Sequence, residues 1–142
     1  MPSLTLHASC VSLGGRGILI WGASGSGKSS LTLQLMAFGA DLIADDQVYL
    51  WSSGDAVQAR SPEALKGLIE ARHFGILMAE AAAEARICAI VDLDLTETER
   101  LPVKRYQKLL ERDVQVFHRV EGPSFAAALI QFLKSGLLDP DA

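Results

Sequence analysis

The chain has 142 residues, of which 49% are hydrophobic and 21% are charged, a composition typical of one globular domain with a buried core. Its formal net charge of -4 argues against a general electrostatic grip on nucleic acid or on an anionic membrane surface. No apolar run approaches the ~20 residues of a membrane span, so we expect a single domain over residues 1–142 that binds neither nucleic acid nor membrane.

The first predicted elements are two strands and a helix. Apolar and polar residues alternate over residues 4–10, which predicts one strand with His7 on its polar face. After a glycine turn, the apolar run over residues 17–21 predicts a buried strand that leads into a glycine-rich loop. Residues 29–38 predict a helix of about ten residues, because Gly39 follows at the position expected of a C-cap.

Two further strands are predicted after this helix. The first covers residues 40–44 and ends at Asp45-Asp46, and the second covers residues 48–51 and is closed by a Ser-Ser-Gly turn. The segment 61–75 is ambiguous, because Pro62 suits a helix start whereas the apolar residues after Gly67 suit a strand.

The C-terminal half continues the alternation of helices and strands. Residues 79–85 are rich in alanine and helix-tolerant, although the segment is short, and residues 86–94 predict a buried strand. Residues 109–120 predict one or two strands. Residues 124–134 predict a helix with Ser124 as its N-cap. Because strands and helices interleave, the predicted fold class is α/β.

The glycine-rich loop after the second strand carries the strongest motif. It satisfies the pattern GxxxxGK[ST] and lies between an apolar strand and a helix, which is the context expected of a phosphate-binding P-loop. Backbone N–H groups and the helix N-terminus would face the β-phosphate, the lysine would reach the β- and γ-phosphates, and the serine would ligate Mg²⁺. The predicted nucleotide-binding residues are Gly22, Ala23, Ser24, Gly25, Ser26, Gly27, Lys28, Ser29 and Ser30.

A second carboxylate must decide which reaction such a loop supports, and two sets of residues are candidates. Asp92 ends an apolar strand in the form of a Walker B residue, which binds Mg²⁺ in many P-loop enzymes. Asp45 and Asp46 end the strand directly after the P-loop helix, and neighbouring residues of an extended strand face opposite ways. One of the two would then face the metal and the other the phosphate acceptor.

The cysteines and the first residues indicate the compartment. Cys10 and Cys88 lie far apart among small or apolar residues, and the sequence has no CxxC pair. They are typical of reduced core residues rather than of a disulfide or a metal site. Residues 1–13 lack the charged and apolar regions of a signal peptide, so we expect a cytoplasmic protein.

Three blocks of the sequence together, GASGSGKSS, LIADDQVYL and LKGLIEARHFGIL, resemble the catalytic domain of the HPr kinase/phosphorylase family. The likeness runs from about His7 to the C-terminal helix, and the chain looks like a short form that comprises this domain only. The resemblance implies a P-loop α/β domain with a mixed β-sheet, related to phosphoenolpyruvate carboxykinase. It also implies ATP-dependent phosphorylation of a serine in the phosphocarrier protein HPr, and the reverse phosphorolysis that releases pyrophosphate.

The resemblance assigns catalytic roles to four residues. Asp45 would take the proton from the acceptor serine in the kinase direction and would activate inorganic phosphate in the other. Lys28, together with Mg²⁺, would stabilise the charge on the transferring group. His7 matches the family histidine that tunes the acid–base pair. Arg100 follows the VDLD strand as the family's mobile-loop arginine does, and would clamp the phosphate or the pyrophosphate.

The resemblance also implies a metal site and an assembly. Ser29, Asp46 and Glu70 would hold Mg²⁺, Arg72 is a weaker candidate for binding the anion, and Asp92 becomes a structural residue. Long-form members of the family assemble as hexamers. A homo-oligomer is therefore compatible with the resemblance, although nothing in this chain determines its size.

The chain departs from the family pattern in three places. The family reads E-x-R-G-x-G around Glu70, whereas this chain has His73 and Phe74 before Gly75. Ser30 stands where a glutamate often follows the first serine of the loop. The C-terminal region that recognises HPr in long members is not clearly matched. The identity of the partner and the balance of kinase and phosphorylase activity therefore stay open.

Two other functions fit the P-loop. One is a small-molecule kinase or NTPase that uses Asp92 as its Walker B residue. The other is a non-catalytic nucleotide sensor, which binds ATP and signals through a conformational change. Substitution of Asp45 and Asp92 in parallel separates the first from the family reaction, and phosphate transfer to an HPr-type protein excludes the second.

Overall fold

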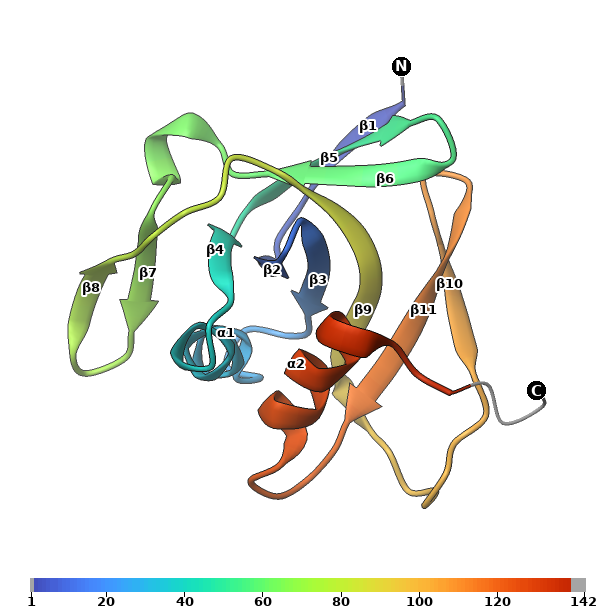
Figure 1. The fold of residues 1–142 in the computed structure, drawn as a ribbon. Helices are drawn as coiled ribbons and strands as arrows, with labels where there is room; N and C mark the ends of the chain where they lie inside the picture. The colour runs from blue at the N-terminus through green and yellow to red at the C-terminus, as the bar shows by residue number, and fades with distance from the viewer. Residues whose placement is uncertain (1, 139–142) are drawn as a thin grey trace.

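The computed structural model describes residues 2–138, which form an α/β fold with most strands in one curled sheet (Figure 1). Two α-helices and one 3₁₀-helix accompany the strands: α1 (Lys28–Ala37), α2 (Phe125–Ser135) and η1 (Glu63–Leu65). No helix among these residues is long and apolar enough to cross a membrane. The strands are β1 (Ser3–Leu6), β2 (Ser9–Leu13), β3 (Arg16–Trp21), β4 (Asp41–Ala44), β5 (Val48–Ser53), β6 (Ala56–Arg60), β7 (Leu68–Ala71), β8 (Gly75–Met78), β9 (Ala85–Thr96), β10 (Arg105–Leu109) and β11 (Arg112–Arg119).

The nine-stranded sheet is mixed and is organised around β9. This long strand pairs in parallel with β3 along one edge, and along its other edge it pairs first with β6, antiparallel, and then with β11, parallel. Antiparallel pairs extend the sheet through β3, β2 and β4 on one side and through β6, β5 and β1 on the other. Figure 1 shows β9 as a curved strand between these two parts. The predicted mixed α/β architecture is therefore confirmed.

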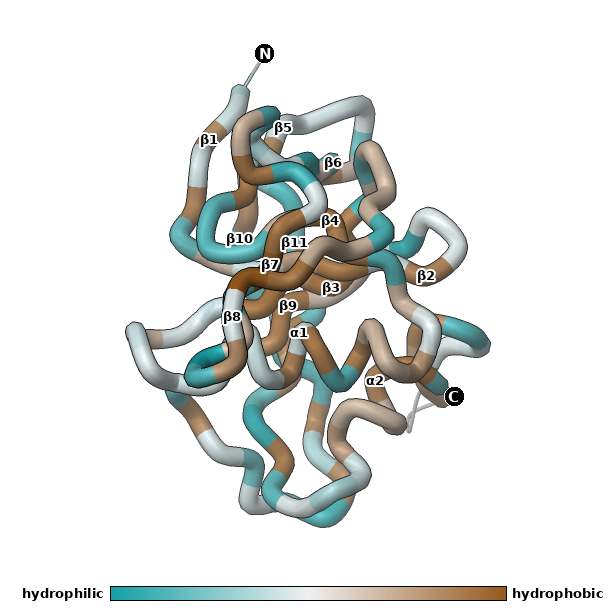
Figure 2. The backbone as a smooth tube through the Cα atoms, turned by 90° about the vertical axis from the view of Figure 1, so that its left-hand side faces the viewer, coloured by the Kyte–Doolittle hydropathy of each residue, from teal (hydrophilic) through white to brown (hydrophobic). Residues whose placement is uncertain are grey.

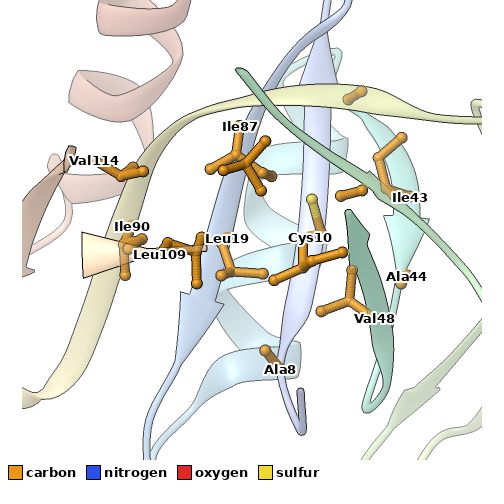
Figure 3. Close-up of a cluster of buried hydrophobic side chains, with 14 of the residues drawn as sticks. Ala8, Cys10, Leu19, Ile43, Ala44, Val48, Ile87, Ile90, Leu109 and Val114 are labelled. Carbon is orange, nitrogen blue, oxygen red and sulfur yellow. The ribbon is translucent and has the colours of Figure 1, made fainter. Parts of the chain in front are cut away.

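Side chains of the sheet pack into a core on each face. Alternate residues of a strand point to opposite faces, so Ile18 and Ile20 pack toward the helices while Leu19 packs into the other cluster. Helices α1 and α2 cover the first of these faces with residues such as Leu35 and Leu129. The curled sheet encloses the second cluster, which Figure 3 shows around Cys10, and Figure 2 shows hydrophobic stretches of β3, β4 and β9 in the middle of the molecule.

The N-terminal segment forms two strands and not the single predicted strand. The apolar alternation does continue through Ala8 and Cys10, which are fully buried. The chain changes partners between Leu6 and Ser9, because β1 pairs with β5 whereas β2 pairs with β3 and β4. A period of two reports which face a residue occupies but not which strand it pairs with. His7 lies in this break and is exposed.

The helix that the composition of residues 79–85 would tolerate does not form. This segment is irregular and runs beside β4, where Leu42 donates to the carbonyl of Glu80 and accepts from the N–H of Ala82, at N···O distances of 3.2 and 3.0 Å. A helix of two turns is too short to be stable alone, so pairing with the strand edge prevails. The ambiguous segment contains both features that were weighed, the short helix η1 and the strand β7.

The other predicted elements are confirmed within a few residues. The helix after the loop begins at Lys28, and the C-terminal helix begins after Ser124. The segment 109–120 holds one strand, β11, and the last residue of β10, which begins at Arg105, before the predicted bounds. Ser124 occupies the N-cap position of α2 without a hydrogen bond from its side chain. Strands β6 and β8 were not predicted; each completes a hairpin with the strand before it.

Candidate functional site

The glycine-rich loop connects β3 to α1 in a conformation that specific glycines permit. Gly22 has a φ of 155°, and a Cβ atom placed on it would lie 2.6 Å from the Oγ of Ser26. Gly27, at the N-cap of α1, has a φ of 101°, a backbone conformation that residues with a side chain rarely adopt. The loop closes on itself through a 3.0 Å bond from the N–H of Ser26 to the carbonyl of Ala23. The result is a tight turn at the N-terminus of a helix, a geometry that binds anions.

Lys28 lies along this loop. The residue is buried, with 9% of its surface exposed. Its Nζ donates to the carbonyls of Gly22 at 2.9 Å and Ala23 at 3.1 Å. These bonds hold the ammonium group against the first residues of the loop, while the loop itself ends at the N-terminus of α1. A phosphate in the loop would therefore meet the lysine charge and the helix dipole together.

Asp45 is the buried member of the acidic pair. Its Oδ1 accepts hydrogen bonds from the hydroxyls of Ser9, at 2.9 Å, and of Ser29, at 3.0 Å. Its Oδ2 accepts from the backbone N–H of Glu70 at 3.3 Å. Residues from β2, α1 and β7 thus converge on one carboxylate at the end of β4. Asp45 thereby contacts the serine that completes the P-loop motif.

Asp46 has a different environment from Asp45. The extended strand ends at Ala44, and Asp46 has a φ of 74°, which is unusual for a residue with a side chain. Its Oδ1 lies 3.2 Å from the Nδ1 of His7, and both side chains are more than half exposed, at 66% and 58%. An exposed pair of this kind contributes less than about 1 kcal/mol, so its importance lies in the position of the two groups.

A cavity of about 370 Å³ opens between the P-loop, the break at His7 and the β7–β8 hairpin. It brings together His7, Asp46 and Glu70 with most of the predicted loop residues, and Asp45 lies behind it, bonded to Ser29. Figure 1 shows the hairpin standing beside α1. The residues that line the cavity are His7, Ser24, Gly25, Gly27, Lys28, Ser29, Ser30, Leu33, Asp46, Glu70, Ala71 and Arg72.

Of the two arginines that the sequence suggested for anion binding, the structure brings only Arg72 to the cavity. Arg72, the weaker candidate, lines the cavity from the end of β7, whereas Arg100 does not line it. Arg100 is exposed in the segment between β9 and β10. The base of that segment is held by Glu97, which pairs with Arg105 and accepts from the N–H groups of Thr98 and Glu99 at 3.1 and 3.2 Å.

The rival carboxylate, Asp92, is engaged elsewhere. Its Oδ1 accepts from the backbone N–H of Asp94 at 3.0 Å, and its side chain does not line the cavity. Glu70, by contrast, lies on the strand β7 and lines the cavity.

The groups around Ser29 fit a magnesium ion. The Ser29 hydroxyl and an oxygen of Asp45 are 3.0 Å apart, and both are the hard oxygen donors that Mg²⁺ prefers. Mg²⁺ usually takes one or two carboxylates and completes its shell with water and substrate phosphates. Within residues 2–138, no group of three or more His, Cys, Asp or Glu side chains is arranged to hold a metal ion.

Sequence reasoning missed three residues that contact the site. Ser9 donates to Asp45, Asp94 accepts from the N–H of Ala23 at 2.9 Å, and Arg119 donates to the carbonyl of Ser26. The VDLD stretch offered a signal for Asp94, since it holds a second carboxylate two residues after Asp92. No local pattern points to Arg119, which lies 93 residues from its partner.

Comparison with known proteins identifies relatives of this chain. The family model described as the HPr Serine kinase C-terminal domain matches residues 1–116. The HPr kinase/phosphorylase of Caldanaerobacter subterraneus is 35% identical over 127 residues, which are 86% of this chain and 42% of that protein. The HPr kinase/phosphorylase of Cupriavidus necator is 42% identical over 77 residues, 54% of this chain and 24% of that protein.

A solved structure shares the fold. The Hpr(Ser) kinase/phosphatase from Coxiella burnetii superposes with a TM-score of 0.76 at 22% identity, over 92% of this chain and 88% of the solved chain. By contrast, the chain spans 42% of the length of the Caldanaerobacter relative.

Proposed function

Since the chain belongs to the HPr serine kinase C-terminal domain family, we propose that it transfers phosphate from ATP to a serine of an HPr-type phosphocarrier protein. We propose that it also catalyses the reverse phosphorolysis, which yields pyrophosphate. The observation that carries the proposal is the cavity in which the P-loop, His7, Asp46 and Glu70 meet, with Asp45 bonded to Ser29 behind it.

The finer description of the fold belongs to the same proposal. Residues 1–142 would form one P-loop domain of the phosphoenolpyruvate carboxykinase-like kind. The parallel pair β3–β9 beside an otherwise largely antiparallel sheet supports this assignment, because the loop leaves β3 at the centre of the sheet.

The proposed chemistry is in-line transfer of the γ-phosphoryl group. The loop residues Gly22 to Ser30 bind the triphosphate, and Lys28 stabilises its charge from the position that its two carbonyl contacts define. Asp45 takes the proton of the acceptor serine and, in reverse, activates inorganic phosphate. His7 tunes this pair through Asp46, and Arg72 or Arg100 binds the phosphate or pyrophosphate as the acceptor docks.

Ser29, Asp46 and Glu70 are the proposed magnesium ligands. When bound, Mg²⁺ supplies positive charge that offsets the charge of the phosphate oxygens. The hydrogen bond between Ser29 and Asp45 also permits the reverse division of labour, in which Asp45 helps to hold the ion and Asp46, beside His7, takes the proton. In the first arrangement Asp46→Asn alters the magnesium dependence and Asp45→Asn abolishes proton transfer. In the second arrangement the effects of the two substitutions are interchanged.

The proposed partner is an HPr-type protein in the cytoplasm, and we propose that the chain assembles as a homo-oligomer. The open cavity supports a protein acceptor, because its mouth is formed by exposed groups such as Glu70 and Arg72 rather than by a closed shell.

The decisive test is incubation of the protein with γ-³²P-labelled ATP, Mg²⁺ and the HPr of the host. Label on a serine, removed by a chase with inorganic phosphate, supports both directions of the proposal. ATP binding without transfer would favour the nucleotide sensor.

Paired variants test the residues. Asp45→Asn is expected to abolish transfer while ATP still binds, and Asp92→Asn is expected to retain transfer because Asp92 bonds to its own strand. The opposite result would assign the reaction to a small-molecule kinase or NTPase that uses Asp92.

A further inference from the structure

The P-loop is held from outside by two side chains of the neighbouring strands. Asp94, near the end of β9, accepts the N–H of Ala23 with both carboxylate oxygens, at 2.9 and 3.2 Å. Arg119, the last residue of β11, donates to the carbonyl of Ser26. The first contact fixes the start of the loop and the second fixes its end.

The contact of Asp94 acts on a residue whose carbonyl also positions the lysine. The N–H of Ala23 bonds to Asp94, and the carbonyl of Ala23 accepts from the Nζ of Lys28 at 3.1 Å. A bond from a backbone N–H to an ionised carboxylate is stronger than one between neutral groups. Asp94 therefore orients the residue against which the ammonium of Lys28 rests.

The guanidinium group of Arg119 joins the loop to β9 through several hydrogen bonds. Its Nε and Nη2 donate to the carbonyl of Leu93 at 3.3 and 3.1 Å, while Nη2 also donates to the carbonyl of Ser26. A Cβ atom placed on Gly27 would lie 4.0 Å from Nη1, so the guanidinium lies directly beside the loop. Because both acceptors are carbonyls, no carboxylate neutralises the charge of Arg119 within these contacts.

An irregularity in the β9–β11 ladder produces this arrangement. His118 is paired with Asp92, but the next residue, Arg119, is paired with Thr96, so one step along β11 spans four along β9. Such bulges redirect side chains and leave backbone groups unpaired. Here the bulged part of β9 contains Leu93 and Asp94, and Arg119 satisfies the carbonyl of Leu93.

The same residue connects the loop to the segment between β9 and β10. The carbonyl of Arg119 accepts from the N–H of Glu97 at 2.8 Å, and Glu97 is the residue that holds the base of this segment. The backbone of Arg119 thus fixes the segment that carries Arg100, and its side chain fixes the P-loop.

We propose that Arg119 and Asp94 are positioning residues that hold the P-loop in the conformation that binds phosphate, and that they thereby set the affinity for the nucleotide. Neither residue lines the cavity, so they act through Ser26 and Ala23 rather than on the substrate. This inference rests on the proposed function only in that the loop binds the phosphates of ATP.

The test compares Arg119→Met with Arg112→Met. Arg112 is a matched control, because its guanidinium also bridges two carbonyls, of Leu110 and Gly54, but on the far part of the sheet. We expect Arg119→Met to weaken ATP binding, measured by calorimetry, by about 10- to 100-fold. Arg112→Met is expected to change thermal stability comparably and to leave the dissociation constant of ATP unchanged.

Conservative variants separate positioning from charge. Arg119→Lys keeps the charge but loses the geometry that bonds to both carbonyls, so we expect its affinity for ATP to lie between those of wild type and Arg119→Met. Asp94→Asn keeps an oxygen that accepts from Ala23, so it is expected to lose less affinity than Asp94→Ala. These milder variants also serve if Arg119→Met does not fold.

Amide hydrogen exchange provides a readout that does not depend on activity. Faster exchange of the amides of residues 22–28 in Arg119→Met and Asp94→Ala, with the rest of the sheet unchanged, is the expected result. Equal loop exchange and equal ATP affinity in the Arg119 and Arg112 variants would overturn the inference. Failure of the wild-type protein to bind ATP would instead refute the proposed function, and exchange would still test the positioning.

Discussion

Single residues at the candidate site depend on neighbours that are distant in sequence. Asp45 is held by Ser9, 36 positions before it, and by Glu70, 25 positions after it. Because a buried carboxylate without partners would be costly, these contacts stabilise its place at the end of β4. The exposed Asp46, next along the chain, pairs with His7. Adjacent residues of the same type thus have different environments.

Gly22 is a residue whose replacement tests the loop geometry. A Cβ atom there would clash with Ser26 and would contact Leu93 at 3.2 Å, so Gly22→Ala should destabilise the protein by about 1–3 kcal/mol and weaken ATP binding. Gly14→Ala is the control, because Gly14 also has a positive φ, 61°, but has open space around it. Denaturant unfolding and calorimetry measure the two effects; unchanged ATP affinity in Gly22→Ala would contradict the expectation.

Glu97 should make stability depend on pH. Hydrogen bonding from Arg105, followed by that from the N–H of Glu99, holds the pKa of the Glu97 carboxyl below its ordinary value. The stabilisation is therefore complete above the ordinary glutamate pKa of about 4.3 and is lost as pH falls through the lower folded value. The difference in unfolding free energy between wild type and Glu97→Gln should shrink on acidification. Glu99→Gln, an exposed change in the same segment, is the control, and a constant difference for Glu97→Gln would refute the expectation.

At the scale of elements, α1 links the loop to the core. Its first residue is Lys28, and its buried face packs with β2 and β3 and with α2. The helix therefore transmits the packing of the core to the position of the lysine. Loss of packing within α1 should lower stability and disturb nucleotide binding only indirectly.

Leu35→Ala tests the contribution of α1. Leu35 is fully buried in the cluster under the helices, so its truncation should cost about 2–5 kcal/mol in the free energy of unfolding. Phe38, next to the C-terminal end of the same helix, is 53% exposed, and Phe38→Ala should cost less than about 1 kcal/mol. Urea unfolding measures both, and similar losses in the two variants would show that the packing of α1 is not as described.

At the scale of the whole molecule, the site joins β9, β11 and the β3–β2–β4 part of the large sheet to the β7–β8 hairpin. The loop leaves β3 and is fixed by β9 and β11, while Asp45 ends β4 and contacts β2 and β7. A ligand bound in the cavity would touch the loop, α1, β7 and the residues that follow β1 and β4, and these groups are held in turn by the large sheet. Binding should stabilise the native state as a unit.

Thermal unfolding with ATP and Mg²⁺ tests this expectation. At a free ligand concentration of about 100 times the dissociation constant, binding adds about 2.7 kcal/mol to stability. For a domain of this size each kcal/mol corresponds to a rise of about 2–4 °C in Tm. Lys28→Ala should abolish the rise, and removal of Mg²⁺ with a chelator should reduce it. An equal shift in Lys28→Ala would place ATP outside the P-loop.

The sequence by itself determined the features that depend on local order. The loop motif lies between a strand and a helix, and the structure has β3 and α1 in those places because apolar period and glycine positions are local properties. The position of Asp45-Asp46 directly after the next strand also followed from chain order, because the apolar run of β4 ends at Ala44.

Only the tertiary structure decided which distant groups meet. The division of the N-terminal segment into β1 and β2, the irregular path of residues 79–85, and the contacts of Asp94 and Arg119 with the loop all depend on strand pairing. Pairing joins residues through backbone hydrogen bonds that every sequence offers equally, so it leaves no local pattern to read. The residues that position the P-loop could therefore be identified only from the pairing of β9 with β11.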